Sequence, residues 1–138
     1  MKRLAIANRG EIAVRIARTA SDMGIETIGM FTEDDAASLH VQRVDQAVQL
    51  PGRGARGYLD IEAVVDAAKK AGADAIHPGY GFLSENADFA RAVEAAGMLF
   101  IGPRPETLDL LGDKVRARQH AHKPVSYTHL TLPTIRLV

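Results

Sequence analysis

Short apolar runs alternate with longer amphipathic segments along most of the chain, and this alternation limits the possible folds more than any other feature. The apolar runs are unbroken, which is typical of strands in a parallel sheet that is covered on both faces. The amphipathic segments carry an apolar residue every three or four positions, as helices packed on such a sheet do. Predicted strands cover residues 3–7, 27–32, 47–50, 75–76 and 98–101.

The helices expected between these strands have recognisable ends. A first helix follows Gly10 and stops at Gly24, and a second is capped by Asp60. Two more are predicted over residues 85–96 and 105–118, whereas the glycine-rich residues 51–57 are predicted to be a loop. We therefore expect an α/β fold, a Rossmann-like three-layer sandwich with a mainly parallel sheet and right-handed crossovers.

Size and composition narrow the possible functions. The 138 residues suffice for one ordinary domain, and 17 basic residues balance 17 acidic ones. This balance gives no overall field to attract nucleic acid or an anionic membrane. The absence of cysteine excludes disulfides and thiolate metal sites, and no apolar run has the length of a membrane span. We expect a cytoplasmic protein without nucleic-acid or membrane partners.

The turn after the first strand invites comparison with a dinucleotide-binding loop. Such a loop needs three glycines, but residues 7–13 (ANRGEIA) supply only Gly10. Glu11 also places a carboxylate where a pyrophosphate would bind, and Glu33 resembles a ribose-binding residue only in its position. The pattern disfavours an NAD site and favours a tight turn, with Glu11 stabilised by the helix macrodipole.

Residues 77–86 (HPGYGFLSEN) form the most unusual segment of the sequence. They follow a buried strand, at the edge where open α/β sheets bind their ligands. Ser84 or Asn86 can cap the next helix. A polar loop with two glycines and a proline indicates a site or an interface. The simpler interpretation is that His77 satisfies a nearby carbonyl and Phe82 belongs to the core.

The chain resembles the N-terminal domain of biotin carboxylases, also called the pre-ATP-grasp domain, from residue 2 to residue 118. Four segments carry the resemblance in order and spacing: residues 7–13, 77–86, 100–103 (FIGP) and 112–114 (GDK). Carbamoyl-phosphate synthetases share the architecture, but residues 77–86 point away from them.

The resemblance implies a function for the parent enzyme. Biotin carboxylases use ATP to activate bicarbonate as carboxyphosphate, and then carboxylate the ureido nitrogen of biotin on a carrier protein. The implied cofactors are ATP and biotin, with magnesium bound by parts of the parent that lie outside this sequence. The implied partners are the biotin carboxyl carrier protein or domain, a carboxyltransferase and a second copy in a homodimer. The fragment alone is expected to be inactive.

The resemblance also assigns site residues. Lys114 matches a position that contacts ATP. Arg15, Tyr80 and Gly81 match positions that form the biotin side of the active site, and Arg18 and Phe82 match the homodimer interface. No catalytic residue and no metal ligand is implied within the chain.

The family pattern ends at residue 118, so we expect two parts: a biotin carboxylase N-terminal-like domain over residues 1–118 and a non-family tail over 119–138. The tail is predicted to be irregular, or to be vector or frame-shifted sequence. Its His120, His122 and His129 fit no zinc-ligand spacing. An alternative for the whole chain is a stand-alone Rossmann-like module that binds a nucleotide or dimerises.

Overall fold

The computed structural model describes residues 1–122. The chain divides into two units, Met1–Pro105 and a second unit that begins at Glu106. Among the described residues, no helix has both the length and the apolar character needed to cross a membrane.

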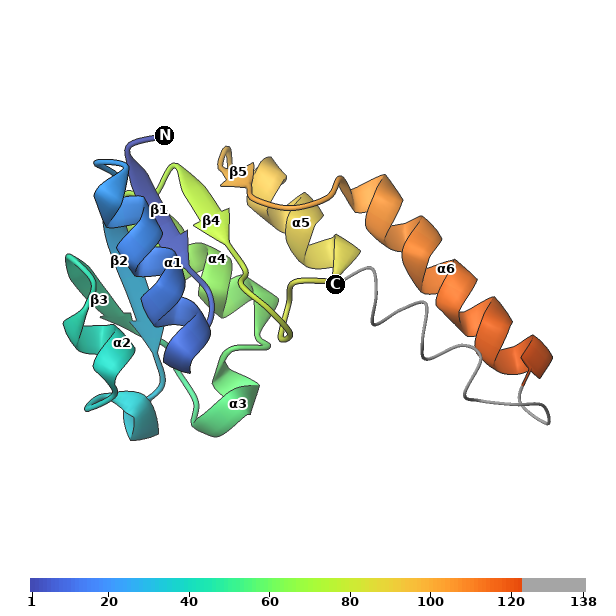
Figure 1. Ribbon diagram of the computed structural model, residues 1–138, viewed down its shortest axis with the longest axis horizontal. Helices are drawn as coiled ribbons and strands as arrows, with labels where there is room; N and C mark the ends of the chain where they lie inside the picture. Colours follow the sequence, from blue (N-terminus) through green and yellow to red (C-terminus); the bar gives the residue numbers. More distant parts are fainter. Residues whose placement is uncertain (123–138) are drawn as a thin grey trace. The chain divides into compact units, whose positions relative to one another are not determined.

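The first unit is built on a five-stranded sheet in which every pairing is parallel (Figure 1). The strand order β3-β2-β1-β4-β5 places the first strand in the middle, which is the order of a doubly wound sheet. This confirms the predicted α/β fold. The strands are β1 (Arg3–Ile6), β2 (Glu26–Phe31), β3 (Gln46–Gln49), β4 (Ala75–His77) and β5 (Leu99–Phe100).

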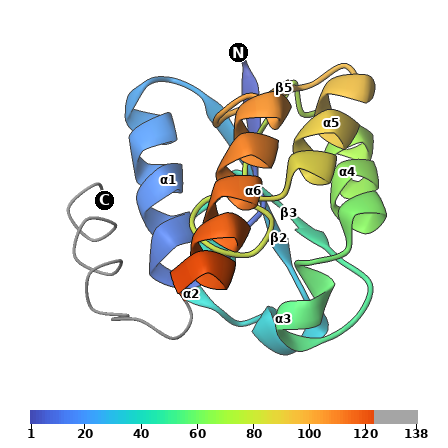
Figure 2. The same cartoon turned by 90° about the vertical axis from the view of Figure 1, so that its right-hand side faces the viewer.

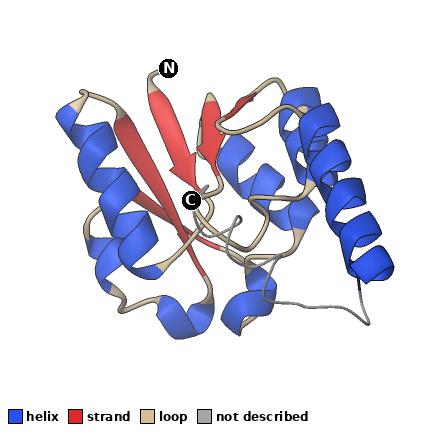
Figure 3. Ribbon diagram, turned by 45° about the vertical axis from the view of Figure 1, so that its right-hand side comes forward, coloured by secondary structure: helices blue, strands red, loops and turns tan. Residues whose placement is uncertain are grey.

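Helices cover both faces of this sheet, giving three layers (Figure 2). Helices α1 (Gly10–Asp22) and α2 (Leu39–Gln42) lie on one face, while α4 (Ile61–Lys70) and α5 (Ala87–Ala95) lie on the other (Figure 3). The central strand is accordingly buried, with Ala5 and Ile6 at 0% exposure. Val64 of α4 and Phe89 of α5 are also fully buried. Because helices cover both faces of the sheet, the strands bury side chains on both sides, and their apolar runs are therefore unbroken.

Two predicted helix caps are confirmed, although the helix predicted over residues 85–96 is shorter and spans Ala87–Ala95 (α5). The Asp60 carboxylate accepts a hydrogen bond from the backbone N–H of Ala63 and caps α4. Asn86 caps α5 by accepting from the N–H of Phe89, so Asn86 rather than Ser84 begins this helix. The side-chain oxygens thereby satisfy backbone donors that the first helical turn leaves unpaired.

Three short elements escaped prediction. They are α2, the 3-10 turn η1 (Glu33–Asp35) and α3 (Gly54–Gly57). The prediction that residues 51–57 form only a loop is therefore wrong for its second half. Elements of three or four residues are too short to show a helical period, so the glycines dominated the sequence pattern.

The second unit begins within α6 (Pro105–His122), which extends four residues beyond the predicted end at residue 118. Two of its apolar residues, Leu111 and Val115, are each 51% exposed. An apolar stripe on a helix is buried only where another surface meets it, and the sequence pattern does not report that surface. The rest of the predicted tail, residues 123–138, lies outside the described residues.

Candidate functional site

Four loops meet at the carboxyl edge of the sheet, because β1, β2, β3 and β4 are parallel and end on the same side. Asn8 and Arg9 follow β1, and Asp34 and Asp35 follow β2. Tyr58 lies beyond β3, and residues 78–86 follow β4.

Asn8 joins the first of these loops to the last. Its side chain is 2% exposed, and its Nδ2 donates hydrogen bonds of 2.9 Å to the Pro78 carbonyl and 2.8 Å to the Tyr80 carbonyl. A Cβ on Gly79 would lie 2.5 Å from this Nδ2, and Gly79 has a φ of +70°. Only glycine therefore fits this close approach.

The loop after β4 has a strained backbone at Phe82. Phe82 is the one non-glycine residue with a positive φ among those described, at 48°. It occupies the second position of a turn that the Ser84 N–H closes by donating to the Gly81 carbonyl at 2.9 Å. A side chain in this conformation costs free energy, so neighbouring contacts must stabilise it.

His77 has a different hydrogen-bond partner from the expected carbonyl. Its Nδ1 accepts from the backbone N–H of Gly79 at 3.0 Å. Burial lowers the pKa of His77. A neutral ring with an unprotonated Nδ1 therefore braces the start of the loop.

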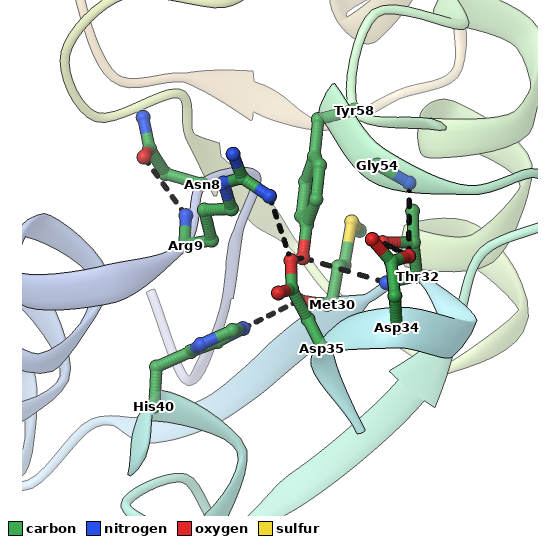
Figure 4. Close-up of polar contacts among 9 residues, drawn as sticks. All are labelled: Asn8, Arg9, Met30, Thr32, Asp34, Asp35, His40, Gly54 and Tyr58. Atoms are coloured by element: carbon green, nitrogen blue, oxygen red, sulfur yellow. Dashed lines mark hydrogen bonds and ion pairs between the residues drawn. The ribbon is translucent and has the colours of Figure 1, made fainter. Parts of the chain in front are cut away.

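Arg9, Asp35 and Tyr58 form a polar network beside this loop (Figure 4). The Arg9 guanidinium lies 3.1 Å from the Asp35 carboxylate, and the Tyr58 hydroxyl donates to the same carboxylate at 2.8 Å. Tyr58 is 1% exposed as a residue, while the Arg9 and Asp35 side chains are 38% and 18% exposed. The Asp35 charge is therefore largely withdrawn from water and held by two donors.

Aromatic rings complete the network. The Arg9 guanidinium lies 5.6 Å from the Tyr58 ring centre and 5.8 Å from that of Phe82. The two rings are 5.4 Å apart and tilted by 49°. We call Arg9, Asp35, Tyr58 and Phe82 the edge cluster. Burial, followed by the hydrogen bond to Asp35, raises the pKa of Tyr58 to about 12, so the phenol stays a donor at neutral pH.

Two further contacts shape the loop after β2. The Asp34 carboxylate accepts hydrogen bonds from the Gly54 backbone N–H at 2.9 Å and the Thr32 hydroxyl at 3.0 Å. These bonds lower the pKa of Asp34, the Gly54 bond most. His40 is buried, and its Nε2 lies 2.9 Å from the Met30 carbonyl (Figure 4).

The site residues predicted from the resemblance lie in different places. Tyr80 is 68% exposed, and Gly81, which begins the turn closed by Ser84, follows it with a φ of +72°. Arg15 lines a mainly apolar cavity of about 370 Å³ together with His77. Arg18, also exposed on α1, lines a separate hollow with Asp22 and Arg43.

Phe82, predicted at a homodimer interface, is half-buried within its own chain in the edge cluster. Lys114 is an exposed residue of α6 in the second unit. In residues 1–122 no three His, Cys, Asp or Glu side chains come together to bind a metal ion.

Sequence reasoning missed Asn8, Arg9, Asp35 and Tyr58 as members of the site. A usable signal was present, since each follows a strand of a parallel sheet and therefore reaches the same edge.

Comparisons with known proteins agree on one family. The sequence pattern described as "Biotin carboxylase, N-terminal domain" matches residues 1–108. A putative urea carboxylase of Emericella nidulans is 53% identical over 123 residues, and the pyruvate carboxylase of Bacillus subtilis is 48% identical over 126. Both matches cover 89% of this chain but only 10% and 11% of the relatives, so the chain spans about a tenth of their length.

Solved structures give the same result. The biotin carboxylase domain of a single-chain bacterial carboxylase has a TM-score of 0.81 and 56% identity, covering 89% of this chain and 29% of that one. The biotin carboxylase domain dimer of Hydrogenobacter thermophilus 2-oxoglutarate carboxylase, in complex with MgADP, ADP and bicarbonate, has a TM-score of 0.81 and 43% identity. That match covers 86% of this chain and 26% of the other.

Proposed function

Because the chain belongs to the family of biotin carboxylase N-terminal domains, we propose that it forms one wall of the active site of an ATP-dependent biotin carboxylase. The observation that carries this proposal is the loop over residues 77–86, which Asn8 anchors while Tyr80 stays exposed. An anchored loop with an exposed ring suits a binding wall, because little conformational freedom is lost when a ligand arrives.

The parent reaction would run in two steps. ATP would phosphorylate bicarbonate, and the resulting carboxyphosphate would release carbon dioxide for attack by the biotin ureido nitrogen. Biotin would arrive on a carboxyl carrier protein or domain, and a carboxyltransferase would consume the product. We propose a cytoplasmic location, where ATP and bicarbonate are both available.

The residues of this chain suit binding rather than chemistry. Tyr80 and Gly81 would contact biotin, with Arg15 as a nearby cation, and the Lys114 ammonium would pair with a nucleotide phosphate. Arg18 and Phe82 would belong to the homodimer interface. Phosphoryl transfer depends on positioned charge around the phosphates, which magnesium supplies when it is bound. We propose that magnesium binds to other parts of the parent, beyond a first domain of residues 1–118.

Titration of the isotopically labelled chain with biotin tests the binding role. We expect the backbone amide signals of Tyr80 and Gly81 to shift, while those of Gln46 and Glu94 stay in place. Biocytin, which carries the same ureido ring on a lysine, should give the same pattern. Shifts confined to other regions would contradict the assignment of this wall.

An activity assay tests where the chemistry lies. Bicarbonate-dependent ATP hydrolysis should be undetectable with this chain and present in a protein that also carries an ATP-grasp domain. Turnover by this chain alone would overturn the proposal that the catalytic groups lie elsewhere.

A further inference from the structure

The edge cluster connects three loops to the one that carries Tyr80. Arg9 comes from the loop after β1, Asp35 from the loop after β2 and Tyr58 from the end of α3, while Phe82 belongs to the turn after β4. The proposed function assigns no role to Arg9, yet Arg9 contacts each of the other three members.

Phe82 requires external support. Its φ of 48° lies in the left-handed region, and it follows Gly79 and Gly81, whose φ values are +70° and +72°. A residue with a Cβ atom disfavours this backbone conformation, so the stability of the turn depends on the contacts of the Phe82 side chain. The Phe82 ring contacts the Tyr58 ring and the Arg9 guanidinium.

Arg9 is itself held in place. Asp35 Oδ2 accepts from the Arg9 guanidinium at 3.1 Å and from the Tyr58 hydroxyl at 2.8 Å, which holds the guanidinium beside the Tyr58 ring. Asn8 Oδ1 also accepts the Arg9 backbone N–H at 2.8 Å, while Asn8 Nδ2 binds the Pro78 and Tyr80 carbonyls. The Asn8–Arg9 dipeptide therefore contacts the loop at two places: the Asn8 side-chain amide binds backbone carbonyls at its start, and the Arg9 guanidinium lies over the Phe82 ring.

We propose that Arg9 is a positioning residue: its guanidinium, oriented by Asp35 and Tyr58, packs against Phe82 and fixes the turn over residues 81–84, and with it the Tyr80–Gly81 segment where this turn begins. That this turn then receives biotin rests on the proposed function. Arg9 acts through Phe82 and touches neither biotin nor the reacting atoms.

Amide hydrogen exchange of the Ser84 N–H tests the inference, because this bond to the Gly81 carbonyl closes the turn. Arg9→Met keeps a long side chain but lacks the charged, planar guanidinium. In this variant we expect the exchange rate of the Ser84 amide to rise roughly tenfold. Arg9→Lys keeps the charge without the plane and should quicken it two- to threefold. The matched control is Arg53→Met. The Arg53 side chain is 74% exposed, and its ion pair with Glu33 is long, at 3.9 Å.

A role confined to global stability would give a different result. Positioning predicts that amides of β1 and β2 keep their wild-type rates in all three variants. Equal acceleration at Ser84 and in β2 would overturn the inference, and so would a Ser84 rate in Arg9→Met equal to that in Arg53→Met.

Biotin titration of the same variants separates this inference from the proposed function. If Arg9 positions the biotin wall, the shifts of Tyr80 and Gly81 at a fixed biotin concentration should shrink several-fold in Arg9→Met and partly recover in Arg9→Lys. If biotin shifts neither residue in the wild-type chain, the proposed function fails, while hydrogen exchange still decides whether Arg9 positions the turn.

Discussion

The two edges of the sheet use the same chemical groups in different surroundings. At the carboxyl edge, Arg9 pairs with an Asp35 carboxylate that is 18% exposed and also binds Tyr58. At the amino edge, Arg3 pairs with a Glu26 carboxylate at 2.5 Å, but these side chains are 50% and 46% exposed. Distance alone would rank the amino-edge pair higher. Burial and shared partners reverse that order, because water screens an exposed pair and competes for its charges.

Removal of the two carboxylates is the most direct test of this difference. Asp35→Ala leaves the Arg9 guanidinium and the Tyr58 hydroxyl without their shared acceptor, and should lower the free energy of unfolding by about 2–4 kcal/mol. Glu26→Ala should lower it by about 0–1 kcal/mol. Urea unfolding of both variants measures the difference. Equal losses would show that burial does not separate the two edges.

Alkaline pH should destabilise the carboxyl edge through Tyr58. Its pKa is about 12 in the folded chain and about 10 when unfolded, so its contribution is complete below pH 10 and is lost as pH rises toward 12. By pH 11 the loss should amount to about 1 kcal/mol, and Tyr58→Phe should abolish this part of the pH dependence. Unfolding free energies at pH 8, 10 and 11 measure it. Tyr80→Phe is the control, because Tyr80 is exposed; an identical pH profile for wild type and Tyr58→Phe would contradict the assignment.

Glycine should have opposite effects in the edge cluster and in a strand. Phe82→Ala and Phe82→Gly both lose the ring, but only glycine relieves the positive φ, so the glycine variant should be more stable by about 1 kcal/mol. At exposed Gln46 in β3 the order should reverse, with Gln46→Gly less stable than Gln46→Ala by about 0.5–1 kcal/mol. Thermal unfolding of the four variants tests both signs. An alanine variant that equals the glycine variant at Phe82 would show that the turn is not strained.

The sequence predicts the strands and helices of this molecule better than the contacts between its loops. The apolar runs, the Asp60 and Asn86 caps and the parallel arrangement follow from local patterns of burial and hydrogen bonding. The edge cluster does not follow from any local pattern, because its members lie on separate loops and meet only after the sheet has formed. The strand ends indicate which residues reach this edge. They do not indicate that Arg9 would select Asp35 over the neighbouring Asp34, which binds Gly54 instead.

The smallest expected effect lies at Asp74, on the amino edge. Burial acts to raise the pKa of Asp74, but hydrogen bonds from the Lys2 and Arg3 backbone N–H groups outweigh it and hold the pKa below its ordinary value. A lowered carboxyl pKa stabilises the fold above about pH 3.8, and this contribution is lost as pH falls through the folded pKa. Because Asp74 is exposed, Asp74→Asn should change the unfolding free energy at pH 7 by less than about 1 kcal/mol. Urea midpoints at pH 7, 4 and 3 should converge for wild type and variant as Asp74 becomes protonated. A gap that persists at pH 3 would mean that Asp74 acts through its shape and not through its charge.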